Sequence, residues 1–126
     1  MEKKILESGE MYLETIYLLK TRSDYVRSVD IVAELGYSKS SVSRGVNLLK
    51  EKGYITVDTS GKIEFTKLGL EYTKDIYERH KILTAFLEGI GVRADIAEND
   101  ACRIEHVISP ESLNAIKTFS ERNKSK

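Results

Sequence analysis

The sequence has one cysteine, one proline and no long hydrophobic run. Because Cys102 stands alone, an intramolecular disulfide framework is excluded, and its thiol would serve as a ligand, a nucleophile or a redox group. The longest apolar runs, such as residues 16–19, fall far short of the roughly 20 residues that span a bilayer. The opening residues, MEKKILESGE, lack the apolar core of a signal peptide. We therefore expect a soluble, cytoplasmic protein with no membrane partner.

The sequence also lacks an excess of either charge, with 20 basic and 20 acidic residues. A net charge of zero argues against a protein that coats nucleic acid indiscriminately. The distribution along the chain is nevertheless uneven. Residues 36–67 hold six basic side chains against three acidic ones, whereas residues 95–111 hold five acidic side chains against one basic one. The first segment suits phosphates and the second suits cations.

Hydrophobic periodicity predicts three helices in the first half of this 126-residue chain. They run from about Lys4 to Arg22, from residue 28 or 30 to Gly36, and from Ser38 to Gly53. Their apolar stripes are, in order, Leu6, Tyr12, Leu13, Ile16, Tyr17 and Leu19; Ile31, Val32 and Leu35; and Val42, Val46 and Leu49. Two short helices joined by a tight turn that contains glycine are a helix-turn-helix.

The rest of the chain predicts a hairpin and three more helices. Segments 54–57 and 62–65 are rich in β-formers and flank the turn residues 58–61, which indicates the wing of a winged helix-turn-helix. Further helices are expected from Thr66 to about residue 90, from residue 93 or 95 to Val107, and from Pro110 to about residue 121. We find no internal repeat and no low-complexity linker. The predicted fold is mainly α, a winged helix-turn-helix domain followed by an α-helical domain.

The outer side of the third helix carries side chains that suit DNA. Arg44 has the reach for a bidentate contact with guanine, and the helix N-terminus at Ser38 suits a phosphate. The candidate DNA contacts are Arg27, Ser38, Lys39, Ser40, Ser41, Ser43, Arg44, Asn47 and Lys62. A polar helix face is most often only solvated, but its combination with a helix-turn-helix and a following hairpin favours DNA binding.

A second group of residues suits a metal ion. Cys102, Glu105 and His106 stand at i, i+3 and i+4, which places a thiol, a carboxylate and an imidazole on one side of a helix. The other candidate ligands are Met11, Glu14, His80 and Glu98. Taken alone, a methionine or cysteine is usually a buried hydrophobic residue and a histidine is usually packed or capped. The triplet is more specific, because solvated helix faces rarely combine these three types.

Four motifs give the sequence a resemblance to the DtxR/MntR family of iron- and manganese-dependent repressors. They are EMYLETIY at residues 10–17, SKSSVSR at 38–44, RHK at 79–81 and ACRIEH at 101–106. The resemblance covers nearly the whole chain and implies a winged helix-turn-helix domain over residues 1–70. It also implies a helical metal-binding and dimerisation domain over residues 71–126, with metal sites between the two. We expect the two-domain form, without the SH3-like third domain.

The resemblance also assigns the candidate ligands. Met11, Cys102, Glu105 and His106 match the activating site of the iron-sensing branch, and His80 matches a histidine of the family's other site. Glu14 matches a carboxylate ligand of the manganese-sensing branch. Thr84 and Glu98 stand where the iron branch has a glutamate and a histidine. The ancillary site is therefore weak, rebuilt around His80, Glu98 and Glu14, or absent.

The choice of metal follows from the ligand types. Met11 and Cys102 replace carboxylates of the manganese branch, and soft sulfur ligands favour metals later than Mn(II) in the affinity series. We predict a repressor that senses Fe(II), with Mn(II) as the less favoured metal. Co(II), Ni(II) or Zn(II) would bind in vitro, so availability in the cell would select iron. The expected partners are double-stranded operator DNA and a second copy of the chain, with no small-molecule substrate.

Two other functions compete with this prediction. A metal-independent winged-helix regulator would use Cys102 to sense a redox signal or a small molecule. A metal-dependent hydrolase would use Glu105 as a general base, but the sequence has no glycine-rich or nucleophile motif to support it. For the dimer, the interface is expected near residues 96–107 and 113–119.

Overall fold

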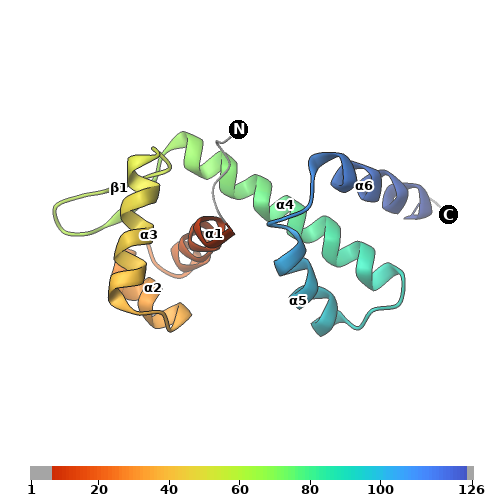
Figure 1. The fold of residues 1–126 in the computed structure, drawn as a ribbon, viewed down its shortest axis with the longest axis horizontal. Helices are drawn as coiled ribbons and strands as arrows, with labels where there is room; N and C mark the ends of the chain where they lie inside the picture. Colours follow the sequence, from red (N-terminus) through yellow and green to blue (C-terminus); the bar gives the residue numbers. More distant parts are fainter. Residues whose placement is uncertain (1–6, 125–126) are drawn as a thin grey trace. The chain divides into compact units, whose positions relative to one another are not determined.

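The computed structural model describes residues 7–124, so the predicted start of the first helix at Lys4 and the apolar Leu6 lie outside the described residues. Within this range the elements are α1 (Glu7–Arg22), α2 (Ser28–Leu35), α3 (Lys39–Glu51), β1 (Ile55–Val57), β2 (Ile63–Phe65), α4 (Lys67–Gly89), α5 (Ala94–Ile104) and α6 (Pro110–Lys124) (Figure 1). The chain forms two compact units, one ending at Lys74 and the other beginning at Asp75. The predicted fold class is confirmed.

The helix-turn-helix is formed by α2 and α3. Gly36 ends α2 in the left-handed conformation, with φ of 73°, which a residue with a Cβ atom rarely adopts. The hydroxyl of Ser38 caps α3 by accepting a hydrogen bond from the backbone N–H of Ser41 at 3.1 Å. The predicted apolar stripe of α3 is buried, as expected: Val42, Val46 and Leu49.

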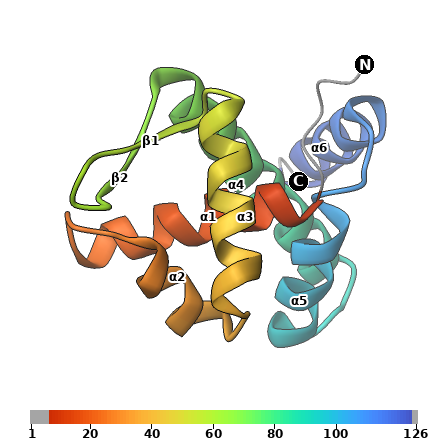
Figure 2. The same ribbon diagram turned by 60° about the vertical axis from the view of Figure 1, so that its left-hand side comes forward.

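The wing is an antiparallel hairpin that extends beside α3 (Figure 2). Both strands begin one residue later than predicted, at Ile55 and Ile63. The backbone N–H of Tyr54 bonds to the carbonyl of Leu49 at 3.0 Å, and that of Lys62 bonds to the carboxylate of Asp58 at 2.9 Å. The backbone N–H groups of Tyr54 and Lys62, which the sequence pattern assigned to the strands, are therefore bonded within turns.

Helix α1 supplies the layer on which α2, α3 and the hairpin pack. The buried core of the first unit is Tyr12, Leu13, Ile16, Leu19, Val26, Ile31, Val42, Val46, Leu49, Tyr54, Ile55 and Ile63. Helix α3 approaches α1 closely at Gly45, where an added Cβ atom would overlap the ring of Tyr12. The position of the recognition helix is therefore set by α1.

The second unit contains most of α4, together with α5 and α6. Helix α5 ends at Ile104, three residues before the predicted end at Val107. The N–H groups of Val107 and Ile108 both bond to the carbonyl of Ile104 at 3.0 Å, which closes the helix. Pro110 then opens α6, since the residue before a proline is disfavoured in a helix. None of the described helices is both long and apolar enough to cross a membrane.

Candidate metal centre and DNA-facing surface

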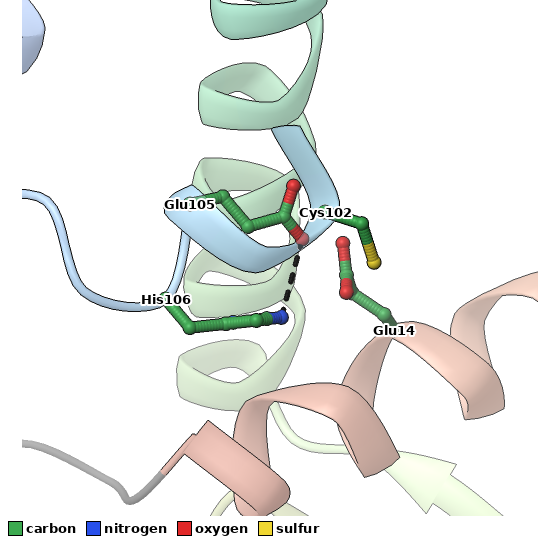
Figure 3. A group of neighbouring side chains, drawn as sticks. All are labelled: Glu14, Cys102, Glu105 and His106. Carbon is green, nitrogen blue, oxygen red and sulfur yellow. Dashed lines mark ion pairs between the residues drawn. The ribbon is translucent and has the colours of Figure 1, made fainter. Parts of the chain in front are cut away.

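The last turn of α5 and the residues after it bring together Cys102, Glu105 and His106 (Figure 3). Glu105 keeps a helical backbone at the C-cap, with φ of −59° and ψ of −23°, so the predicted spacing still places the three side chains on one side. Glu105 and His106 are buried, and Cys102 is partly buried. One ligand atom from each lies within 4.8 Å of the others. Donors to one ion lie about 2.0 to 2.3 Å from it and up to about 4.6 Å from each other, so these atoms are close to a shared coordination sphere.

The carboxylate of Glu105 lies between two imidazole rings. Its Oε1 atom is 2.7 Å from Nδ1 of His80, and its Oε2 atom is 3.4 Å from Nε2 of His106. The His80 ring also has Nε2 3.9 Å from the carboxylate of Glu98, whose side chain is 71% exposed. The fold therefore brings His80, which is 25 residues away in sequence, to the Glu105 carboxylate, and His80 in turn lies between Glu105 and Glu98.

This donor set fits a divalent transition metal. A carboxylate that is 0% exposed needs positive charge nearby, because burying an ionised group without a counter-charge is costly. Imidazole, thiolate and carboxylate are the ligands that first-row transition metals share in proteins. An ion held by Cys102, Glu105 and His106 would supply two positive charges to that carboxylate.

The remaining predicted ligands lie on α1, in the first unit. Met11 and Glu14 are both partly buried and stand one helical turn apart; Glu14 is the fourth side chain drawn in Figure 3. The thioether sulfur of Met11 accepts a hydrogen bond from the hydroxyl of Tyr37 at 3.4 Å. In the second unit, the hydroxyl of Thr84 is buried and has no hydrogen-bond partner among residues 7–124. Thr84 therefore offers a hydroxyl and no carboxylate at this position.

The predicted DNA-contacting side chains lie at the surface of the first unit. Those that are exposed are Arg27, Ser38, Lys39, Ser40, Ser43, Arg44 and Asn47; Ser41 and Lys62 are partly buried. Arg44 Nη2 lies 3.5 Å from the hydroxyl of Ser41, which also bonds to Ser38 at 3.0 Å. The start of α3 is thus an ordered row of hydroxyls beside one guanidinium.

Two basic residues of the predicted DNA surface, Lys62 in the wing and Arg27 at the N-cap of α2, are held by local contacts. The ammonium of Lys62 is 3.0 Å from the carboxylate of Glu64, and this hydrogen bond raises the pKa of Lys62. The guanidinium of Arg27 lies 5.6 Å from the centre of the Tyr25 ring, which is a cation–π distance. The turn itself is fixed by the Asp58 carboxylate, which accepts hydrogen bonds from the backbone N–H groups of Ser60 and Lys62, both at 2.9 Å.

Two residues near the candidate ligands carry contacts that the sequence pattern did not assign. Arg79 donates a hydrogen bond to the backbone carbonyl of Glu105 at 2.7 Å and so anchors the end of α5 to α4. The RHK motif at residues 79–81 was the sequence feature that could have identified Arg79. Tyr37 contacts Met11, but it lies in a turn where no periodicity marks it.

Comparison with known families matches both halves of the chain. Residues 4–62 match the model described as iron dependent repressor, N-terminal DNA binding domain. Residues 66–126 match the model described as iron dependent repressor, metal binding and dimerisation domain.

Individual relatives agree with these matches. An HTH-type transcriptional regulator of Methanocaldococcus jannaschii is 33% identical over 122 residues, which is 95% of this chain and 98% of that protein. The HTH-type transcriptional regulator MntR of Lysinibacillus sphaericus is 35% identical over 109 residues, covering 86% of this chain and 78% of that one. The structure of the manganese regulator SloR superposes with a TM-score of 0.76 at 25% identity and covers 88% of this chain. This chain spans 52% of the SloR chain.

Proposed function

The chain belongs to the DtxR/MntR family of metal-dependent transcriptional repressors, a family of regulators and not of enzymes, and from this premise we propose that it represses metal-homeostasis genes by binding operator DNA when a divalent metal ion is bound around Glu105. The observation that carries the proposal is the fully buried Glu105 carboxylate, with His80 at 2.7 Å and with Cys102 and His106 beside it. We assign DNA binding to residues 1–70 and metal binding with dimerisation to residues 71–126. Operator DNA as the partner implies a cytoplasmic site of action.

We assign the activating metal to Cys102, Glu105 and His106, with Met11 and Glu14 as further ligands. The support for Met11 and Glu14 is the family motif at residues 10–17. We assign His80 and Glu98 to an ancillary site, weakened by Thr84. A bound ion would supply positive charge to these side chains, and the sulfur, carboxylate and imidazole donors would select which metal binds.

Fe(II) is the metal that the sulfur donors favour. A thiolate and a thioether are softer than carboxylates, and soft ligands strengthen binding to metals that follow Mn(II) in the affinity series. Mn(II) is the second candidate, because one of the similar structures is that of the manganese regulator SloR. Co(II), Ni(II) and Zn(II) would bind the same donors in vitro.

The DNA contacts are assigned to Arg27, Ser38, Lys39, Ser40, Ser41, Ser43, Arg44, Asn47 and Lys62. Arg44 and Asn47 read base edges in the major groove, and the hydroxyls and lysines contact phosphates. A homodimer would place two recognition helices at two operator half-sites. Its interface is assigned to residues 96–107 and 113–119, where the exposed apolar side chains are Ile96, Val107 and Phe119.

The mechanism is a thermodynamic linkage. A metal that restricts the positions of the DNA-binding unit would raise the fraction of dimers whose recognition helices match the spacing of the two half-sites. Bound DNA would then raise the affinity for the metal by the same factor as the metal raises the affinity for DNA. We expect Cys102→Ala and Met11→Ala each to abolish the metal-stimulated part of DNA binding.

Fluorescence anisotropy on promoter DNA, with and without Co(II), tests this expectation. Arg44→Ala is the matched control, because it should weaken DNA binding at every metal concentration while leaving Co(II) affinity unchanged. Far-ultraviolet circular dichroism checks that each variant is folded. Full metal stimulation in both Cys102→Ala and Met11→Ala would reject the assigned site.

A further inference from the structure

The thioether of Met11 has a hydrogen-bond partner in the turn of the helix-turn-helix. The hydroxyl of Tyr37 donates to the Met11 sulfur at 3.4 Å. Tyr37 stands between Gly36, which ends α2, and Ser38, which caps α3. The turn that starts the recognition helix is therefore joined to α1 at the residue that the family motif marks as a metal ligand.

The neighbouring contacts make this join firm. The ring of Tyr12 meets the ring of Tyr37 edge to face, with 6.2 Å between centroids. The hydroxyl of Tyr12 reaches the backbone carbonyl of Ser41 at 3.4 Å, in the first turn of α3. Tyr12 is buried and Gly45 lies against its ring, so α1 and the start of α3 cannot separate locally without disturbing this packing.

A thioether sulfur is a weak hydrogen-bond acceptor, and it is weaker still after it has given electron density to a metal ion. The Tyr37 hydroxyl and a bound metal therefore compete for the same sulfur. Tyr37 is 41% exposed and directly precedes Ser38, which is assigned above to DNA binding and whose hydroxyl lies 3.3 Å from that of Ser40. A hydroxyl released from Met11 can turn toward a phosphate there.

We propose that Tyr37 is a positioning residue that couples metal binding at Met11 to DNA binding at the start of α3, by exchanging its hydroxyl between the Met11 sulfur and a DNA phosphate. This inference rests on the proposed function, in which Met11 is a ligand of the activating metal. Thermodynamic linkage predicts the direction of the change in metal affinity and in DNA affinity. Removing the hydroxyl removes a competitor for the sulfur, so metal binding without DNA becomes tighter, while the gain in DNA affinity on adding metal becomes smaller.

The test is Tyr37→Phe, which keeps the ring and its contact with Tyr12. Co(II) affinity is measured without DNA, by competition with a chromogenic chelator, and the sulfur-to-Co(II) absorption band reports whether sulfur is bound. Since one hydrogen bond changes equilibria by roughly threefold to tenfold, we expect Co(II) to bind about threefold tighter to Tyr37→Phe. We expect the metal-dependent gain in affinity for promoter DNA to fall by a similar factor.

The matched control is Tyr25→Phe. Its hydroxyl, on a residue that is 46% exposed, bonds to the carbonyl of Ser60 at 3.3 Å, which is not a candidate metal ligand. Co(II) affinity should stay unchanged in this variant. A merely structural role for Tyr37 would loosen the site, so unchanged or weaker Co(II) binding in Tyr37→Phe overturns the proposal.

Met11→Leu separates the two proposals. If Met11 is a ligand, this variant weakens Co(II) binding, and adding Tyr37→Phe to it then has no further effect. If Met11→Leu leaves Co(II) affinity unchanged, the ligand assignment itself is wrong and the coupling falls with it. If Met11→Leu weakens Co(II) binding but Tyr37→Phe alone has no effect, only the coupling is wrong.

Discussion

At the scale of single residues, Glu105 is the centre of the candidate metal site. Its carboxylate is fully buried, lies against two imidazoles, and has its own backbone carbonyl held by Arg79. Charge interactions are stronger in such an environment than in water. A carboxylate placed in this way binds a divalent ion far more strongly than an exposed one.

Substituting Glu105→Gln keeps the side chain's size but removes its charge. We expect Co(II) affinity to fall at least about tenfold, the scale on which ligands and their supporting groups affect metal sites. Competition with a chelator measures this change. Glu98→Gln is the control, because the Glu98 carboxylate is 71% exposed and stands 3.9 Å from His80, so its loss should matter much less. Equal losses in the two variants would contradict a central role for Glu105.

The residue scale also shows what the sequence could predict. Cys102, Glu105 and His106 share one helix end, so their spacing alone placed them together. His80 reaches Glu105 only because α4 packs on α5, a contact between residues 25 apart. Spacing along one helix contains no such information, and the resemblance to a family marked His80 only as a residue of the other metal site, not as a partner of Glu105. Neither helical spacing nor the family resemblance marked Tyr37, because a residue in a turn is not part of a periodic pattern.

At the scale of elements, the recognition helix depends on a close approach to α1. Gly45→Ala would push a methyl group into the ring of buried Tyr12. We expect a loss of about 1 to 3 kcal/mol in the free energy of unfolding, the usual cost of overpacking a core. Gly89→Ala is the control, since no atom of the described residues beyond its own stretch of helix lies within 4 Å of its added Cβ, and it should be neutral or gain up to about 1 kcal/mol. Urea denaturation compares the two, and a Gly45→Ala protein as stable as the Gly89→Ala protein would show that α3 can shift freely.

The wing depends on one carboxylate. The hydroxyl of Ser60 and the N–H of Lys62 donate to Asp58, and they hold the pKa of that carboxyl below its ordinary value of 3.8. Because the pKa is lowered by folding, the stabilisation is complete above the unfolded pKa and is lost as the pH falls through the folded one.

A pH titration followed by nuclear magnetic resonance should therefore place the Asp58 pKa below 3.8. In Asp58→Ala, the amide protons of Ser60 and Lys62 should exchange faster with solvent and promoter DNA should bind more weakly. Thr59→Ala, one residue along the same turn, is the control and should change neither. Slow exchange that persists in Asp58→Ala would mean that the wing is ordered by its strand pairing instead.

Apolar periodicity predicted α1 to α4, and Pro110 predicted the start of α6. The sequence pattern misplaced the ends of elements where local hydrogen bonds decide them. Helix α5 stops at Ile104 because the carbonyl of that residue accepts two N–H groups, and both strands of the wing lose their first residue to turns. Such bonds depend on the path of the chain after the element, which a pattern within the element does not specify.

At the scale of the whole molecule, the two compact units differ in the charge of the segments that carry the candidate sites. Residues 36–67 carry an excess of basic side chains and lie in the unit with the winged helix-turn-helix, whereas the acidic residues of segment 95–111 lie in the other unit. One unit therefore suits the phosphates of DNA and the other suits a cation. The family match covers both units, so the whole described chain belongs to a family of metal-dependent transcriptional repressors.

The most direct test is an anaerobic titration of the metal-free protein with Fe(II) and Mn(II) in parallel, followed by fluorescence anisotropy on the promoter DNA of its own or a neighbouring gene. We predict that DNA binding is weak in the presence of a chelator and tightens with Fe(II) at a lower concentration than with Mn(II). If Mn(II) acts at the lower concentration, the assignment of iron from Met11 and Cys102 is wrong. If DNA binds equally well with chelator and with either metal, control of this protein by a metal ion is contradicted.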